Sequence, residues 1–128
     1  MYTLGVQREF TARHYLIGGD WGEENREHAH RYRVEVRLTG TTLNRHGYLV
    51  DIVEVEHRLE AIIERYRDAL LNDLPEFAGL NPSIEHFARI IWQAFTRPGR
   101  IPNITSITVR LWESDIAWVE YTGDLSSA

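Results

Sequence analysis

The stretch "HAHRYRVEVRLT" (residues 28–39) decides the fold, because polar and apolar side chains alternate along its length. The even positions hold one set of side chains: His28, His30, Tyr32, Val34, Val36 and Leu38. The odd positions are mostly charged. Successive side chains of a strand point to opposite faces, so this pattern is typical of a half-buried antiparallel strand. Its beginning is unusual, since two imidazoles stand on the face that must cover the core.

A further strand is predicted on each side of this one along the chain. Residues 2–16 alternate with the same period, although Arg8 interrupts the apolar side, and they predict a first strand. The segment 17–27 between the two strands contains glycines and several acids, which is typical of a loop. After the turn "NRHG" (44–47), the residues "YLVDI" (48–52) predict a short third strand.

Two amphipathic helices follow. Apolar residues recur at three- and four-residue steps in the first: Val55, Leu59, Ile62, Ile63, Tyr66 and Leu70. Asn81 or Ser83 can cap the second helix, and Pro82 suits its first turn. Its buried stripe holds Phe87, Ile90, Ile91, Ala94 and Phe95. Alternation returns at 104–113 and 117–123, so the sequence predicts an α+β domain spanning residues 1–128, with both helices on one face of an antiparallel sheet.

The composition excludes several classes of protein. The 128 residues are 43% hydrophobic and 26% charged, as in a globular domain with a real core, and disorder is not expected. A net charge of −5 without a basic cluster argues against nucleic-acid binding. Neither a membrane-length apolar run nor the apolar region of a signal peptide is visible, so we expect a cytoplasmic protein that does not bind membranes. The absence of cysteine excludes disulfides, zinc–thiolate sites and a cysteine nucleophile.

Three histidines form a candidate metal site. His28 and His30 point the same way along their strand, roughly 7 Å apart. His14 ends the apolar side of the first strand, and an antiparallel pairing through the loop 17–27 would bring it close to them. Three imidazole nitrogens with an open fourth position are the ligand set of many catalytic zinc ions. The alternative is that they are polar strand-end residues, hydrogen-bonded to nearby acids.

Six pieces of the sequence, taken in order, resemble those of one enzyme family. The pieces are "FTARH" (10–14), "HAHRYRVEV" (28–36), "GYLVDI" (47–52), "LLND" (70–73), "NPSIEHFARIIW" (81–92) and "VRLWESDIAWVEY" (109–121). Together they resemble the 6-pyruvoyl-tetrahydropterin synthase and 6-carboxytetrahydropterin synthase family over nearly the whole chain. Each piece alone is modest, but the series in the correct order is specific.

The resemblance implies a T-fold, in which three subunits join their sheets into a barrel and two trimers commonly stack into a hexamer. It implies active sites at subunit interfaces and Zn²⁺ on His14, His28 and His30. It also implies that Glu113 holds the pterin ring, since a carboxylate can accept two parallel N–H bonds from an aminopyrimidine edge. Ser83 stands where the family has a pterin-contacting threonine, or serves only as a helix cap.

The sequence departs from the family at its catalytic residues. The usual base is a cysteine four residues before the first histidine of His-x-His, and this chain has Glu24 there. The family's aspartate–histidine relay would fall, counted back from Asn72, on Arg67 and Asp68, or with a one-residue gap on Asp68 and Ala69. Either way the relay histidine is missing. We retain Asp68 as a candidate assisting residue.

Glu24 points to one branch of the family. That branch carries glutamate in place of the cysteine and cleaves the side chain of dihydroneopterin triphosphate to give 6-hydroxymethyl-dihydropterin. A glutamate can act as a base where burial or a neighbouring acid raises its pKa. The alternative is that "EENRE" (23–27) is a solvated acidic loop.

The prediction is therefore a zinc-dependent lyase that acts on a reduced pterin with non-standard catalytic residues. One alternative is a zinc-containing homologue that binds a pterin but has lost catalysis. A second is a purely structural T-fold protein, which would bind neither metal nor ligand.

Overall fold

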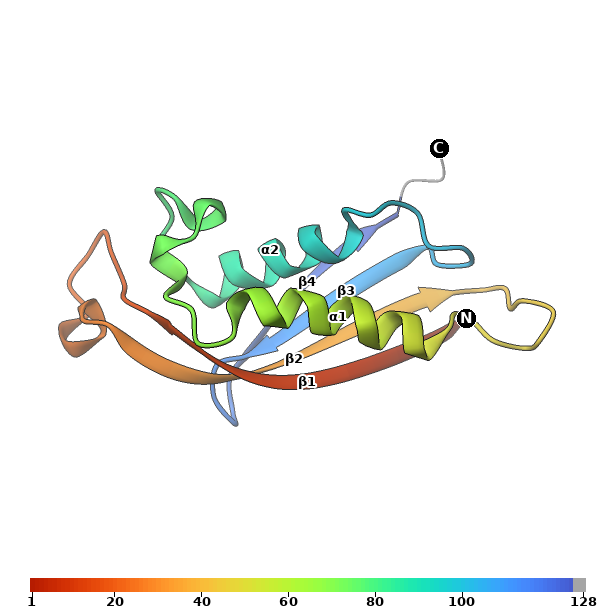
Figure 1. The fold of residues 1–128 in the computed structure, drawn as a ribbon, viewed down its shortest axis with the longest axis horizontal. Helices are drawn as coiled ribbons and strands as arrows, with labels where there is room; N and C mark the ends of the chain where they lie inside the picture. Colours follow the sequence, from red (N-terminus) through yellow and green to blue (C-terminus); the bar gives the residue numbers. More distant parts are fainter. Residues whose placement is uncertain (126–128) are drawn as a thin grey trace.

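The computed structural model describes residues 1–125. These residues form four strands and two α-helices (Figure 1): β1 (Tyr2–His14), β2 (His28–Gly40), α1 (Ile52–Tyr66), α2 (Ile84–Thr96), β3 (Ser106–Trp112) and β4 (Trp118–Asp124). Three short 3₁₀ helices lie in the connections: η1 (Gly22–Asn25), η2 (Leu71–Asp73) and η3 (Pro75–Phe77). Within the described part of the chain, no helix combines the length and apolar character needed to cross a membrane.

The strands form one antiparallel sheet in the order β1-β2-β3-β4, and both helices cover the same face of it (Figure 1). The α+β prediction is confirmed. The register between β1 and β2 runs from Tyr2 opposite Gly40 to His14 opposite His28. Strand β3 pairs with β2 only from Arg33 onward, so residues 28–32 at the start of β2 extend beyond the end of β3. His28 and His30 lie on this extension, and His14 of β1 lies opposite His28.

The core lies between the sheet and the helices. Val34, Val36 and Leu38 of β2 are fully buried, as their shared parity predicts. Phe87 of α2 is also fully buried, and four aromatic rings surround it at centroid distances of 5.1–5.9 Å: Phe10, Tyr32, Tyr66 and Phe77. These rings come from both layers and fix the helices against the end of the sheet near the histidines.

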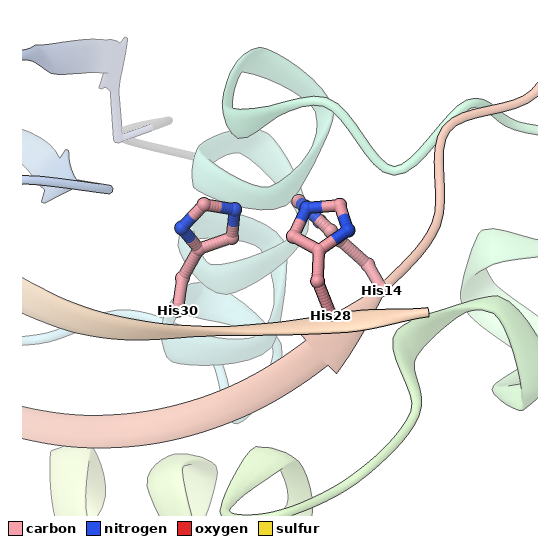
Figure 2. A group of neighbouring side chains, drawn as sticks. All are labelled: His14, His28 and His30. Atoms are coloured by element: carbon pink, nitrogen blue, oxygen red, sulfur yellow. The ribbon is translucent and has the colours of Figure 1, made fainter. Parts of the chain in front are cut away.

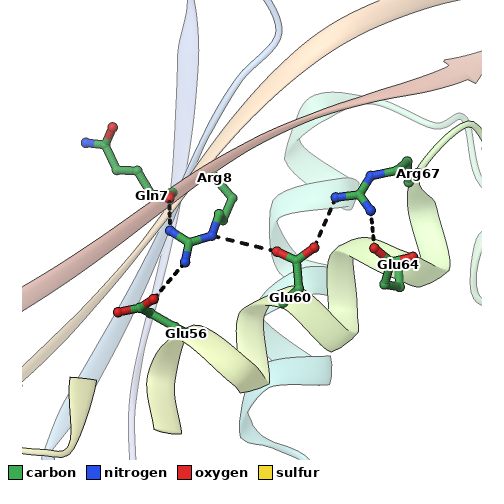
Figure 3. A network of polar contacts seen from close by, with 6 residues as sticks. All are labelled: Gln7, Arg8, Glu56, Glu60, Glu64 and Arg67. Carbon is green, nitrogen blue, oxygen red and sulfur yellow. Dashed lines mark hydrogen bonds and ion pairs between the residues drawn. The ribbon is translucent and has the colours of Figure 1, made fainter. Parts of the chain in front are cut away.

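Arg8 does not interrupt β1, although it stands on the apolar parity. It lies on the edge strand, where its guanidinium reaches Glu56 at 3.0 Å and Glu60 at 3.7 Å on α1. The network in Figure 3 continues through Arg67 at the end of the helix, which contacts both Glu60 and Glu64. A long cationic side chain at a sheet edge can keep its charge in water, so the strand continues.

Two predicted elements were wrong in extent or kind. Residues 48–51 form no strand, because Asp51 caps α1 instead: its carboxylate accepts the Val53 N–H at 2.9 Å, and the helix begins at Ile52. The first helix ends at Tyr66, before the predicted stripe residue Leu70. Asp68 follows in a left-handed conformation (φ 58°), and Leu70 pairs beside Arg13 of β1 in an isolated bridge.

Candidate active site

The two long strands bring the three predicted histidines together (Figure 2). His14 ends β1 directly opposite His28, which begins β2, and His30 lies opposite Ala12 on the same face. One ligand atom from each imidazole lies within 4.8 Å of the others. The Nε2 atoms of His14 and His28 are 3.0 Å apart. Convergence of this kind requires the antiparallel register that the alternation predicted.

The surroundings orient the imidazoles. His28 Nδ1 lies 2.7 Å from the carbonyl oxygen of Arg26. Because a carbonyl only accepts, Nδ1 must donate, which leaves the Nε2 lone pair of the neutral ring free for a metal. His14 is 2% exposed, and its Nδ1 lies 3.2 Å from the hydroxyl of Tyr32.

Burial keeps His14 neutral. Desolvation, followed by the charges of His30 and His28, lowers the pKa of His14 from 6.5 to about 4, although a hydrogen bond to the Pro82 backbone acts in the opposite direction. A metal ligand must be deprotonated to bind, so a depressed pKa favours coordination at neutral pH.

The donor set fits a divalent cation. His30 Nε2 is buried and has no hydrogen-bond partner among the described residues, although Glu113 Oε1 lies 3.0 Å away. The same oxygen lies 3.6 Å from His14 Nε2. With Zn–N distances of about 2.0–2.1 Å, tetrahedral geometry separates two ligand nitrogens by roughly 3.3 Å, close to the spacing between His14 and His28. Three imidazoles beside a carboxylate therefore form a possible metal site.

A hollow of about 190 Å³ opens beside the triad, between the loop 15–27, the start of α2 and the end of β3. Four residues predicted from the sequence line it: His14, Glu24, Ser83 and Glu113. Six others also line it: Leu16, Trp21, Asn81, Pro82, Ile84 and Glu85. The second set was not predicted as site residues. Leu16, Trp21, Asn81 and Pro82 lie in loops, which carry no periodic signal, and Ile84 and Glu85 begin α2 outside its predicted buried stripe. Asn81 and Pro82 were considered only as residues at the start of the second helix, whereas Ser83 was also predicted to contact the ring.

Side chains from distant segments hold the loop over this hollow. Asn72 accepts the Tyr15 N–H at 3.0 Å and donates to the Tyr15 carbonyl at 3.0 Å. Asn81 accepts the Ile17 N–H at 2.8 Å. The backbone of Glu24 accepts the Leu16 N–H at 2.9 Å. These bonds place η1, which carries Glu24, at the rim of the hollow.

Comparison with known proteins agrees with this architecture. The family model for 6-pyruvoyl tetrahydropterin synthase matches residues 3–124. The chain belongs to this family. Its members generally depend on a metal, in keeping with the possible three-histidine site, and the resemblance seen in the sequence is confirmed.

Several solved structures share the fold. The 6-pyruvoyl tetrahydropterin synthase of Caenorhabditis elegans has a TM-score of 0.82 at 19% identity, with 95% of each chain covered. The enzyme of Plasmodium vivax, as a catalytic-residue mutant, has a TM-score of 0.79 at 15% identity, covering 97% of this chain and 98% of that one. A putative dihydroneopterin aldolase of Vibrio cholerae O1 has a TM-score of 0.56 at 14% identity, covering 97% and 98%.

Of the two remaining residues predicted from the family pattern, one lines the hollow beside the triad and the other does not. Ser83 caps α2, since its hydroxyl accepts the His86 N–H at 3.1 Å, and it lines the hollow as well. Asp68 is exposed and lines a different hollow, beside Arg67 and Arg31. Its backbone N–H donates to the Thr11 carbonyl at 2.6 Å, which fixes it against the outer edge of β1. Within one chain, Asp68 is therefore not part of the hollow beside the triad.

Proposed function

We propose that this protein is a zinc-dependent lyase that acts on a reduced pterin such as 7,8-dihydroneopterin triphosphate. One observation carries the proposal: a single hollow is lined by a histidine of the triad, by Glu113 and by Glu24, in a chain without cysteine. These groups are the minimum set for binding a ring, polarising its side chain and removing a proton.

The residues divide these roles between them. The Nε2 atoms of His14, His28 and His30 would hold the zinc ion, which when bound acidifies a C–H bond next to the oxygens of the substrate side chain. Glu113 accepts two N–H bonds from the aminopyrimidine edge of the ring. Ser83, at the wall of the hollow, contributes a hydroxyl to the same end of the substrate.

Glu24 is the proposed base. Its carboxylate is exposed in the free protein, and a ring that fills the hollow would exclude water from it and leave it facing the substrate. Structures of the related Plasmodium vivax enzyme carry a glutamate changed to cysteine or alanine, and both are described as catalytic-residue mutants. A catalytic glutamate therefore has a parallel in a protein of the same fold.

The proposed assembly is the homotrimer or homohexamer that the family resemblance implies, located in the cytoplasm. Strands β1 and β4 are the two edges of the sheet, so three copies can pair edge to edge and close a barrel. Asp68 lies against the edge strand β1, outside the hollow of its own chain. Its assistance in catalysis therefore requires a site completed by a second copy.

An alternative is a zinc-containing homologue that binds a pterin without converting it. The missing relay histidine favours this alternative, together with the separation of Asp68 from the triad. Both functions share the metal and the ring-binding Glu113, so only turnover separates them.

The experiment is a long incubation of zinc-loaded protein with 7,8-dihydroneopterin triphosphate, with products identified by mass spectrometry. The test variant is Glu24→Ala. Glu23→Ala is the matched control, because Glu23 is the neighbouring exposed glutamate on η1 but does not line the hollow. We expect a new pterin from the wild type and from Glu23→Ala, and none from Glu24→Ala. Unchanged substrate in every sample would refute the lyase function and favour the binding homologue.

A further inference from the structure

The loop over the hollow presents one large aromatic side chain to it, and that side chain has no role in the proposed chemistry. Trp21 lines the same hollow as Glu24 and Glu113, and it is 43% exposed. Other exposed apolar side chains, such as Ile116 and Trp118, do not line this hollow. An exposed indole at the wall of a small hollow is available to a ligand.

The backbone around Trp21 is held in place by Asn25. The Asn25 side chain accepts the Trp21 N–H at 2.7 Å and donates to the carbonyls of Leu16 and Gly19, both at 3.0 Å. One half-buried amide therefore connects both ends of the turn before η1. These hydrogen bonds fix the backbone from which the indole projects. The loop therefore loses less conformational entropy when a ligand binds against the indole.

The indole itself rests on Gly19. A Cβ at position 19 would lie 2.7 Å from Cη2 of Trp21, which is closer than real Cβ atoms approach, and 3.0 Å from Cζ3. The six-membered part of the indole thus packs where only a glycine leaves room. Gly19 and Asn25 together give the ring a built position.

The size and chemistry of the hollow select a flat ligand. At about 190 Å³ it is smaller than the roughly 300–1,000 Å³ of pockets that enclose a drug-sized molecule, so it has room for a heterocyclic ring and not for a whole phosphorylated substrate. A carboxylate, Glu113, lines the hollow together with the indole. A ring with N–H donors on its edge and a flat π-face satisfies both groups.

We infer that Trp21 is a substrate-binding residue whose indole stacks on the planar ring that Glu113 holds at its edge. This inference rests on the proposed function, which it deepens by naming the residue that recognises the face of the ring. Stacking on a heterocycle requires a flat aromatic face on the side chain. Phenylalanine can therefore replace tryptophan, and leucine cannot.

The test uses zinc-loaded protein and 6-methyl-7,8-dihydropterin, which has the ring but no hydroxylated side chain to be processed. Affinity is measured by calorimetry. We expect Trp21→Leu to weaken binding about tenfold or more, and Trp21→Phe to stay within about threefold of the wild type. Tyr48→Leu, which removes an exposed aromatic side chain outside the hollow and outside the sheet, should leave affinity unchanged. Gly19→Ala keeps the indole but displaces it, so its affinity should fall between the wild type and Trp21→Leu.

A second readout separates contact from loop support. Binding of the probe should quench the fluorescence of Trp21, so the quenching seen in the wild type should be largely lost in Trp21→Phe although the ring still binds. Equal affinity of the wild type and Trp21→Leu, with binding abolished in Glu113→Gln, would overturn the inference and leave the proposed function intact. Absence of binding to the wild type would overturn both.

Discussion

Acidification of the metal-free protein should destabilise it through His14. The imidazole is 2% exposed, and its folded-state pKa is lowered from 6.5 to about 4, mainly by burial. Between these values the unfolded chain binds a proton that the folded chain does not. Stability therefore falls as the pH decreases from 6.5 toward 4, and the contribution is constant above and below this window.

The magnitude follows from the shift. A full shift of this size corresponds to about 3 kcal/mol, since one pKa unit is about 1.4 kcal/mol. Between pH 7 and pH 5 the two titration curves give a loss of about 2 kcal/mol of unfolding free energy. Bound zinc would suppress this loss near neutral pH, because the metal competes with the proton for the same nitrogen.

The assay is urea denaturation of the metal-free wild type and of His14→Gln at pH 7 and pH 5. Other groups titrate in both proteins, so the informative quantity is the difference between them. We expect the stability of the wild type relative to His14→Gln to fall by about 2 kcal/mol between pH 7 and pH 5. If the difference stays constant with pH, His14 is not held neutral by burial, and the electrostatic account of the triad is wrong.

Three further substitutions test the aromatic core, one ion pair and one close backbone approach. Phe87→Ala removes the ring at the centre of the aromatic cluster and should cost about 3–5 kcal/mol by urea denaturation, and a loss below 1 kcal/mol would show that the cluster is not close-packed. Glu76→Gln should cost about 1–2 kcal/mol at pH 7, because the hydrogen bond from half-exposed Arg65 lowers the pKa of Glu76 from 4.5 to about 2. This stabilisation is present above pH 4.5 and lost as the pH falls toward 2, so the two proteins should converge in acid. Gly40→Ala would place a Cβ 2.0 Å from the Asn103 carbonyl oxygen and should lower the melting temperature markedly, whereas a wild-type melting curve would contradict the close approach.

The sheet and the triad could be predicted because both follow from a period of two. Alternation over 28–38 assigns His28 and His30 to the buried face, and pairing with the first strand brings His14 beside them. No knowledge of distant contacts is needed for that step. The helix stripes were predictable for the same reason, since packing selects one face.

The errors arose where local pattern allows two readings. "YLVDI" reads as a strand by composition, but Asp51 followed by Glu54 is also a capping signal, and the structure uses it to begin α1. The predicted apolar stripe of the first helix continued to Leu70, because periodicity does not show where a helix ends. In the structure α1 ends at Tyr66, and Asp68 has a left-handed backbone conformation that stops the helix. Asp68 is itself fixed by contact with Thr11, far away in the sequence.

The loop residues of the site could not have been found by pattern at all. Trp21 reaches the hollow because Asn25, Asn72 and Asn81 fold the loop 15–27 over the start of α2. These are long-range or irregular hydrogen bonds that leave no period in the sequence. Glu24 was singled out only because it precedes His28 by four residues, as the catalytic residue of the family does.

The most direct test of the account is a crystal structure of zinc-loaded protein with 6-methyl-7,8-dihydropterin, with anomalous data collected at the zinc edge. We predict one zinc peak per chain, within bonding distance of Nε2 of His14, His28 and His30, with the aminopyrimidine edge of the ring on Glu113. Absence of zinc from the triad in fully loaded protein, or a pterin bound away from Glu113, would contradict it.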